Sequence, residues 1–249
     1  MSKLSVVEYA EFISNSSNWR ERYARSIFGF SKLGHLTELE YEDTPFALAI
    51  ELWDHLINIK GAPKSAWFTP KKVAIKMVEL AEIEEGETVM DPCAGIGVLL
   101  KVAQAAGGKT IGYEIDKWLV EVSKELDPKL HIMCRDFLEY PRYEHVEYKN
   151  FSLTRPTFQP NVVLLNPPTG KQQGVADIAM TMLLRVAKLY EKARAVVVLP
   201  KGFFSKKAKR RNTRAITNLF DIDEVVALHK NALRPWFKQK PVLYRLSRR

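Results

Sequence analysis

The sequence predicts an α/β protein, in which a mainly parallel β-sheet is covered by helices on both faces and is preceded by a helical region. Two patterns carry this prediction. From about residue 66, short apolar runs alternate with amphipathic helical segments, whereas earlier apolar residues recur at three- and four-residue spacing. Strands that alternate with helices form parallel sheets, because each helix crosses over to the start of the next strand. A chain of 249 residues accommodates such a domain and an additional segment.

The first 60 residues read as helical and carry 6 basic and 9 acidic side chains. The third helical pattern starts at Thr44-Pro45, and proline suits the first turn of a helix. The breaker-rich segment GAPKS then separates this region from the rest of the chain. We therefore expect an N-terminal helical region, residues 1–60, and a second domain, residues 61–249. The helical patterns of the first region occupy residues 6–13, 18–30 and 44–59.

The second region contains seven segments with strand character, and helical patterns lie between them. The expected strands are 87–91, 109–115, 130–136, 161–166, 194–200, 223–229 and 241–247. The expected helices are 71–81, 98–107, 117–126, 174–193 and 206–219. Residues 141–160 show no period and read as a long loop, which in a compact domain is often functional.

Composition excludes several classes of protein. Two cysteines cannot build a disulfide framework and fit a reducing compartment, so we expect a cytoplasmic protein. No run approaches the ~20 apolar residues that a membrane span needs, and the histidines and cysteines lack metal-ligand spacing. We expect neither membrane association nor a metal site.

The charge is unevenly distributed along the chain. Residues 1–200 carry 24 basic and 26 acidic side chains, whereas residues 201–249 carry 14 basic and 3 acidic ones. Such a segment is either a solvated basic face or a surface for a polyanion, because Lys and Arg release condensed counterions from phosphates. Aromatic residues stand within the basic segment, and this pattern favours nucleic acid.

The segment Asp91-Pro92-Cys93-Ala94-Gly95-Ile96-Gly97 follows the first expected strand and precedes a helix. In an open α/β sheet this position is the ligand crevice. Glycines allow a ligand to approach the backbone, and the free amides at a helix start favour an anionic group. A nicotinamide site would read G-x-G-x-x-G directly after the strand, whereas Leu100 stands at the third position here. The pattern favours a different nucleotide-like ligand.

Polar residues also end the next two strands. Glu114, in Gly-Tyr-Glu-Ile-Asp, can accept both ribose hydroxyls of a nucleoside or can simply cap a helix. Asp136 and Phe137 offer an acceptor for an adenine amino group and an aromatic ring, although Phe137 can equally be a core residue. Three such positions at successive strand ends favour a nucleoside site.

The segment Asn166-Pro167-Pro168-Thr169 follows an apolar strand. The two prolines have no backbone donors and stiffen the turn, so their carbonyls and the Asn166 side-chain oxygen can present acceptors. A planar amine held by such acceptors has its lone pair turned out of conjugation, ready to attack an electrophilic methyl group. A rigid turn is the structural alternative for an isolated Asn-Pro-Pro.

The motifs DPCAGIG, GYEID, CRDF and NPPT, preceded by Phe68-Thr69-Pro70, resemble those of class I S-adenosylmethionine-dependent amino-methyltransferases. The sequence is most similar to N6-adenine DNA methyltransferases with the gamma motif order, particularly the methylation subunits of type I restriction-modification systems. The resemblance spans roughly residues 61–246. It implies a Rossmann-like fold with a seven-stranded sheet, S-adenosyl-L-methionine as cofactor and adenine N6 in DNA as the methylated amine.

The resemblance also implies roles for individual residues. Phe68, Thr69 and Pro70 would close over the cofactor. Its methionine part would lie among Asp91, Cys93, Ala94, Gly95 and Gly97, its ribose on Glu114, and its adenine among Ile115, Asp136 and Phe137. Asn166 would border the cofactor and, with Pro167, hold the target amine, in a catalytic segment that continues through Pro168 and Thr169.

Two departures from the family pattern bear on these implications. Family members usually carry an aromatic residue after the two prolines, where it stacks on a flipped-out base, and Thr169 cannot stack. Phe203 and Phe204 are alternative stacking residues, although packing explains them as well. The type I subunits are also longer and act with a separate specificity subunit.

Several functions therefore compete. The foremost is methylation of adenine N6 in DNA, with contact through residues 201–249 and with a separate specificity subunit or a homodimer. The alternatives are methylation of RNA adenine, methylation of a protein glutamine, and a cofactor-binding nucleic-acid module that has lost catalysis.

Overall fold

The computed structural model describes residues 4–20, 22–23, 45–58, 69–139, 159–168, 178–204, 210–233 and 240–249. The strands are β1 (Thr88–Asp91), β2 (Lys109–Glu114), β3 (Ile132–Cys134), β4 (Val162–Leu165), β5 (Arg194–Pro200), β6 (Phe220–Ala227) and β7 (Pro241–Arg248). The helices are α1 (Val6–Ser14), α3 (Pro45–Asn58), α4 (Lys71–Ala81), α5 (Val98–Ala105), α6 (Lys117–Leu126), α7 (Ile178–Leu189) and α8 (Arg210–Thr217).

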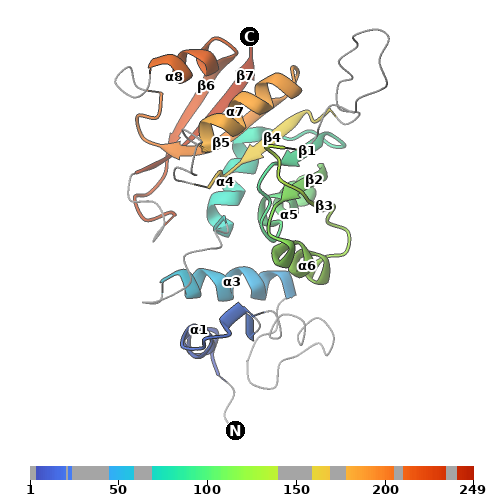
Figure 1. Cartoon of the computed structure of the whole chain (residues 1–249), viewed down its shortest axis with the longest axis vertical. Coiled ribbons are helices and arrows are strands. Elements are labelled where there is room, and N and C mark those ends of the chain that lie inside the picture. Colours follow the sequence, from blue (N-terminus) through green and yellow to red (C-terminus); the bar gives the residue numbers. More distant parts are fainter. Residues whose placement is uncertain are drawn as a thin grey trace.

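The seven strands form one twisted sheet in the order β3-β2-β1-β4-β5-β7-β6 (Figure 1). Strands β1 to β5 pair in parallel, whereas β7 lies antiparallel between β5 and β6. The carboxyl ends of β1, β2, β3 and β4 consequently lie along one edge of the sheet. This is the edge at which open α/β sheets bind ligands.

The central strands are apolar because both faces of the sheet are covered. All four residues of β4 and the five central residues of β5 are buried. One core cluster packs α4, α5 and α6 against one face, and a second packs α7 and Ile216 of α8 against the other. The predicted fold class, with a mainly parallel seven-stranded sheet and helices on both faces, is confirmed.

The N-terminal helices pack beside α6 rather than on the sheet (Figure 1). A capping box formed by Ser5 and Glu8 starts α1, and Tyr23 donates a hydrogen bond of 3.0 Å to the Ala49 carbonyl of α3. The rings of Trp19 and Tyr23 lie 6.0 Å from that of Trp118 at the start of α6. The predicted helical region is confirmed for α1 and α3, and the division at residues 60 and 61 remains our proposal.

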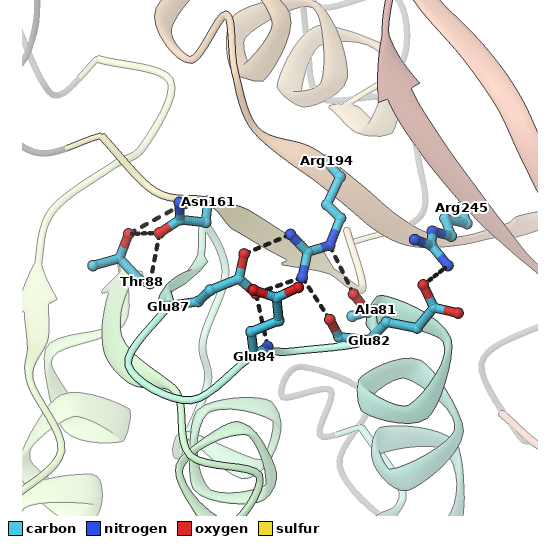
Figure 2. A network of polar contacts seen from close by, with 8 residues as sticks. All are labelled: Ala81, Glu82, Glu84, Glu87, Thr88, Asn161, Arg194 and Arg245. Carbon is cyan, nitrogen blue, oxygen red and sulfur yellow. Dashed lines mark hydrogen bonds and ion pairs between the residues drawn. The ribbon is translucent and has the colours of Figure 1, made fainter.

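A clamp centred on Arg194 fixes the opposite edge of the sheet, where β1, β4 and β5 begin (Figure 2). Its guanidinium donates to the Ala81 and Glu82 carbonyls at the end of α4, each over 2.7 Å, and to both carboxylate oxygens of Glu87. Glu82 has a left-handed backbone (φ 47°), which costs a non-glycine residue about 1–2 kcal/mol. Beside the clamp, the Asn161 side-chain oxygen accepts hydrogen bonds from the amide and the hydroxyl of Thr88 (Figure 2). These contacts hold the strand starts together, and the sequence did not predict them.

The structure shifts several predicted boundaries. Strand β6 starts at Phe220 rather than residue 223, because its first residues pair with the end of β7. Strand β3 has only three residues, and α7 and α8 are shorter than predicted within the described residues. Most of the predicted helix 18–30 and of the predicted loop 141–160 lies outside the described residues. In the described part of the chain, no helix is long and apolar enough to cross a membrane.

Candidate functional site

The loop between β1 and α5 forms the centre of the candidate site. Asp91, the last residue of β1, is 1% exposed and accepts a hydrogen bond of 2.9 Å from the amide of Cys93. Gly95 and Gly97 have φ angles of 56° and 92°, a left-handed conformation that side chains disfavour. Gly97 then directly precedes Val98, the first residue of α5. The glycines of the motif are thus required by the turn that carries the chain from strand to helix.

Glu114, at the end of β2, lies against this loop. One carboxylate oxygen accepts from the amide of Gly95 over 2.8 Å, and the other accepts from the amide of Asp116 over 2.9 Å. The structural alternative, a helix cap, is filled by Asp116 instead, whose side chain accepts from the amide of Trp118 at the start of α6. A carboxylate has about four lone-pair sites, so Glu114 keeps capacity to accept from a ligand hydroxyl.

The two carboxylates resist ionisation. Burial raises the pKa of Asp91 to about 7, and the nearby Glu114 charge adds to the effect. Burial also raises the pKa of Glu114, although hydrogen bonds from Asp116 and Gly95 oppose the shift. A ligand that brings positive charge and hydroxyl donors would stabilise the ionised form of both carboxylates and lower their pKa values.

The end of β3 supplies the next group of predicted residues. Asp136 is half-buried, and one carboxylate oxygen accepts from the amide of Leu138 over 2.8 Å. Phe137 is 2% exposed and packs against Tyr113, with 5.6 Å between ring centroids. Phe137 is thus a core residue here, and its contact with an adenine ring remains a prediction. Ile115 is 65% exposed, so its side chain is accessible to a flat ligand at the end of β2.

Asn166, directly after β4, connects the loop of Asp91 with the segment before α4. Its side-chain nitrogen donates to the Thr69 hydroxyl over 3.1 Å, and its backbone carbonyl accepts from the Cys93 thiol over 3.2 Å. Thr69 is buried, as is Pro167. Segments that are 97 and 73 residues apart in the chain therefore meet at this asparagine.

Other predicted residues lie beside this centre or outside the described residues. Pro70 is the N-cap of α4, Ala94 is buried and Pro168 is half-buried. Phe68 and Thr169 lie outside the described residues. The roles assigned to all of these residues remain predictions.

Phe203 and Phe204 pack against the core. Their ring centroids lie 5.1 Å apart, and Phe204 contacts Tyr244 edge-on at 4.9 Å. Both rings are half-buried against the second core cluster. This packing supports the structural explanation of the two rings, and their use as stacking residues remains a prediction.

The sheet order, the glycine turn after β1 and the acidic ends of β1 and β2 together define a class I methyltransferase fold. A solved structure from Listeria monocytogenes, described as a class I S-adenosylmethionine-dependent methyltransferase, shares this fold, with a TM-score of 0.64 and 12% identity over 98% of this chain and 85% of that one. Residues 52–236 match the model of the N-6 DNA Methylase family. The chain belongs to this family.

Two further relatives are subunits of restriction systems. The EcoEI type I restriction enzyme methylase subunit of Escherichia coli is 26% identical over 68% of this chain and 40% of its own length. A Vibrio vulnificus YJ016 structure, described as a modification subunit of a type I restriction enzyme, has a TM-score of 0.63 and 20% identity over 82% of this chain and 49% of that one. The chain thus spans less than half the length of each of these two proteins.

Proposed function

We propose that this protein transfers a methyl group from S-adenosyl-L-methionine to adenine N6 in DNA. The observation that carries the proposal is the contact between Cys93 and Asn166. It joins the loop that would hold the methionine part of the cofactor to the residue that would hold the amine. A methyl donor and an acceptor amine bound on either side of this contact would be neighbours, and such positioning lowers the barrier to transfer.

The described residues fit this cofactor. Asp91 and Glu114 are buried carboxylates whose pKa values are raised, so a ligand with a sulfonium and an ammonium group would favour their ionised forms. We propose that Glu114 binds the ribose through its hydroxyls, and that the exposed Ile115 covers the adenine. We propose Gly95 and Gly97 for the methionine part and Asp136 for the adenine amino group.

When bound, S-adenosyl-L-methionine supplies the electrophilic methyl group. The side-chain oxygen of Asn166 and the carbonyl of Pro167 would accept hydrogen bonds from the target amine. Positive charge grows on the amine nitrogen during transfer, and acceptors already oriented toward it stabilise that charge more strongly than water does. The chain's own contribution is thus orientation and electrostatic stabilisation.

Exposed lysines support nucleic-acid contact at the edge of the sheet that carries Asn166. The Lys201 amide, just after β5, bonds to the Lys240 carbonyl just before β7 over 2.9 Å, and Lys230 follows the end of β6 nearby. The arginines at the end of β7 lie at the opposite edge, where Arg248 binds the Leu219 carbonyl and Arg249 binds Asp221. Among the side chains of residues 201–249 that the structure describes, we therefore propose Lys201, Lys230 and Lys240 as DNA contacts.

We also propose a separate specificity subunit. The two restriction-system relatives are themselves subunits. The basic lysines can hold phosphates but carry no sequence information, so choice of a target site needs further contacts with base edges. A homodimer and a cytoplasmic location remain predictions.

Methyl transfer from radiolabelled S-adenosyl-L-methionine to DNA, RNA and protein, followed by nucleoside and amino-acid analysis, tests the proposal. Labelled N6-methyladenosine from RNA would identify RNA as the substrate, and labelled methylglutamine would identify a protein. Either result would contradict DNA as the substrate. We expect labelled N6-methyldeoxyadenosine from DNA, and its loss in Asn166→Ala. Label that is unaffected by Asn166→Ala would show that the amine site is elsewhere.

A further inference from the structure

Asn166 is held at both ends by residues from other parts of the chain. Thr69 precedes α4 and accepts from the side-chain amide, while Cys93 lies in the loop after β1 and donates to the backbone carbonyl. The two contacts measure 3.1 Å and 3.2 Å. The partners that hold Asn166 therefore come from outside the Asn166-Pro167 turn.

The nitrogen branch of the Asn166 amide, and not its oxygen branch, faces Thr69. An asparagine side chain carries a nitrogen with two donors on one branch and an oxygen acceptor on the other. The Thr69 hydroxyl takes the nitrogen branch, so the oxygen branch is directed away from Thr69. A flipped amide would present N–H donors to an amine, which needs acceptors instead.

The contact with Cys93 fixes the adjoining peptide. The Asn166 carbonyl belongs to the planar peptide unit that connects Asn166 to Pro167, so a hydrogen bond to this oxygen sets the plane from which Pro167 continues. The thiol remains a donor, because burial and the neighbouring Asp91 and Glu114 charges raise the pKa of Cys93 well above its ordinary value. The backbone amide of Cys93 also donates to the Asp91 carboxylate, which anchors Cys93 to β1.

We propose that Thr69 and Cys93 are positioning residues for methyl transfer, which orient the side-chain oxygen of Asn166 and the following peptide toward the acceptor amine. This inference rests on the proposed function and deepens it. It assigns Thr69 a role toward the amine rather than only toward the cofactor. It assigns Cys93 a role as a hydrogen-bond donor to Asn166 in addition to its expected place beside the methionine part.

Paired substitutions separate this role from simple packing. Thr69→Val keeps the shape and removes the acceptor, whereas Thr69→Ser keeps the hydroxyl. Cys93→Ala removes the donor, whereas Cys93→Ser keeps one. In single-turnover reactions with saturating S-adenosyl-L-methionine and DNA, we expect Thr69→Val to slow methyl transfer by roughly 10- to 100-fold, because a misplaced Asn166 would hold the amine less precisely. Cys93→Ala should have a smaller effect, and both serine variants should stay within about threefold of the wild type.

The dissociation constant of the cofactor provides the second measurement. The proposal expects Thr69→Val to bind S-adenosyl-L-methionine within about twofold of the wild type, because the lost contact is with Asn166 and the shape of the side chain is kept. Unchanged transfer by Thr69→Val, or a loss that is fully accounted for by weaker cofactor binding, would overturn it. Circular dichroism identifies any variant that fails to fold. If Thr69→Val does not fold, Thr69→Ser still tests the proposal, because a rate far below the wild type in folded Thr69→Ser would also overturn the proposal.

A wild-type protein that transfers no methyl group would contradict the proposed function rather than this inference. The orientation of Asn166 is then read from the side-chain amide resonances of ¹⁵N-labelled protein. We expect these resonances to shift in Thr69→Val and to stay close to their wild-type positions in Thr69→Ser. Resonances that are unchanged in Thr69→Val would overturn the assigned orientation.

Discussion

The Arg20 guanidinium lies 3.2 Å from the Asp116 carboxylate, a contact between the N-terminal region and the start of α6. Arg20 also lies over the rings of Trp19 and Trp118, at 5.5 Å and 5.1 Å from their centroids. The amide of Asp116 binds Glu114, the residue proposed to hold the ribose. One connection between the N-terminal region and the candidate cofactor site therefore runs through Asp116.

Arg20→Ala should weaken cofactor binding as well as the fold. The ion pair is partly exposed, so we expect it and the two ring contacts to contribute only about 1–2 kcal/mol to the free energy of unfolding. We also expect the dissociation constant of S-adenosyl-L-methionine to rise severalfold, because Asp116 loses a contact that holds it beside Glu114. Calorimetry and urea denaturation measure the two effects. Lys117→Ala, which removes an exposed pair with Glu121 on the same helix, is the control and should change neither quantity.

Asp91 should make the stability of the ligand-free protein depend on pH. Its pKa is about 7 in the folded protein against an ordinary value of 3.8, so the folded state holds the proton more tightly than the unfolded state. Its contribution to stability is greatest below about pH 4 and declines as the pH rises to about 7, at about 1.4 kcal/mol per pH unit. The gain in stability from Asp91→Asn should therefore grow by about 2 kcal/mol between pH 5 and pH 7, as measured by urea denaturation. A gain that is constant with pH would contradict the assignment.

Lys201 and Lys240 should contribute to DNA affinity in a salt-dependent way. Each phosphate contact adds about 0.9 to the slope of log affinity against log salt concentration. The double variant Lys201→Gln, Lys240→Gln should therefore reduce the slope by about 2 in fluorescence-anisotropy titrations. Lys188→Gln combined with Arg249→Gln removes the same charge at the opposite edge of the sheet and should leave the slope unchanged. Equal slopes for the two double variants would remove the support for this DNA surface.

Arg194→Leu should destabilise the fold without acting at the candidate site. It leaves the largely buried Glu87 carboxylate unpaired and removes donors from the Ala81 and Glu82 carbonyls. We expect a loss of about 3 kcal/mol in the free energy of unfolding at neutral pH. Arg194 lowers the pKa of Glu87, so this pair stabilises the fold above the ordinary pKa of a glutamate, and the loss should diminish as the pH falls and Glu87 becomes protonated. Arg249→Gln, which breaks an exposed pair with Asp221, should cost under about 1 kcal/mol.

Local patterns were sufficient to predict the sheet and the residues at its carboxyl edge. Buried parallel strands appear as continuous apolar runs, and the turn after β1 needs its glycines, so both leave a local signal. Contacts between distant segments leave none. Thr69 and Asn166 are 97 residues apart and Arg20 and Asp116 are 96 apart, and nothing within either segment indicates its partner. The ambiguity of Phe137 has the same origin, because a core ring and a ring beside a ligand look alike in sequence.

Calorimetric titration with S-adenosyl-L-methionine tests the central claim most directly. We predict that the wild-type protein binds one equivalent, and that Glu114→Gln weakens binding by roughly 100-fold, because charged hydrogen bonds contribute about 1.5–3 kcal/mol each. Glu121→Gln, on the exposed face of α6, is the matched control and should bind as the wild type does. Absence of binding by the folded wild-type protein, or equal affinity in Glu114→Gln, would contradict the account.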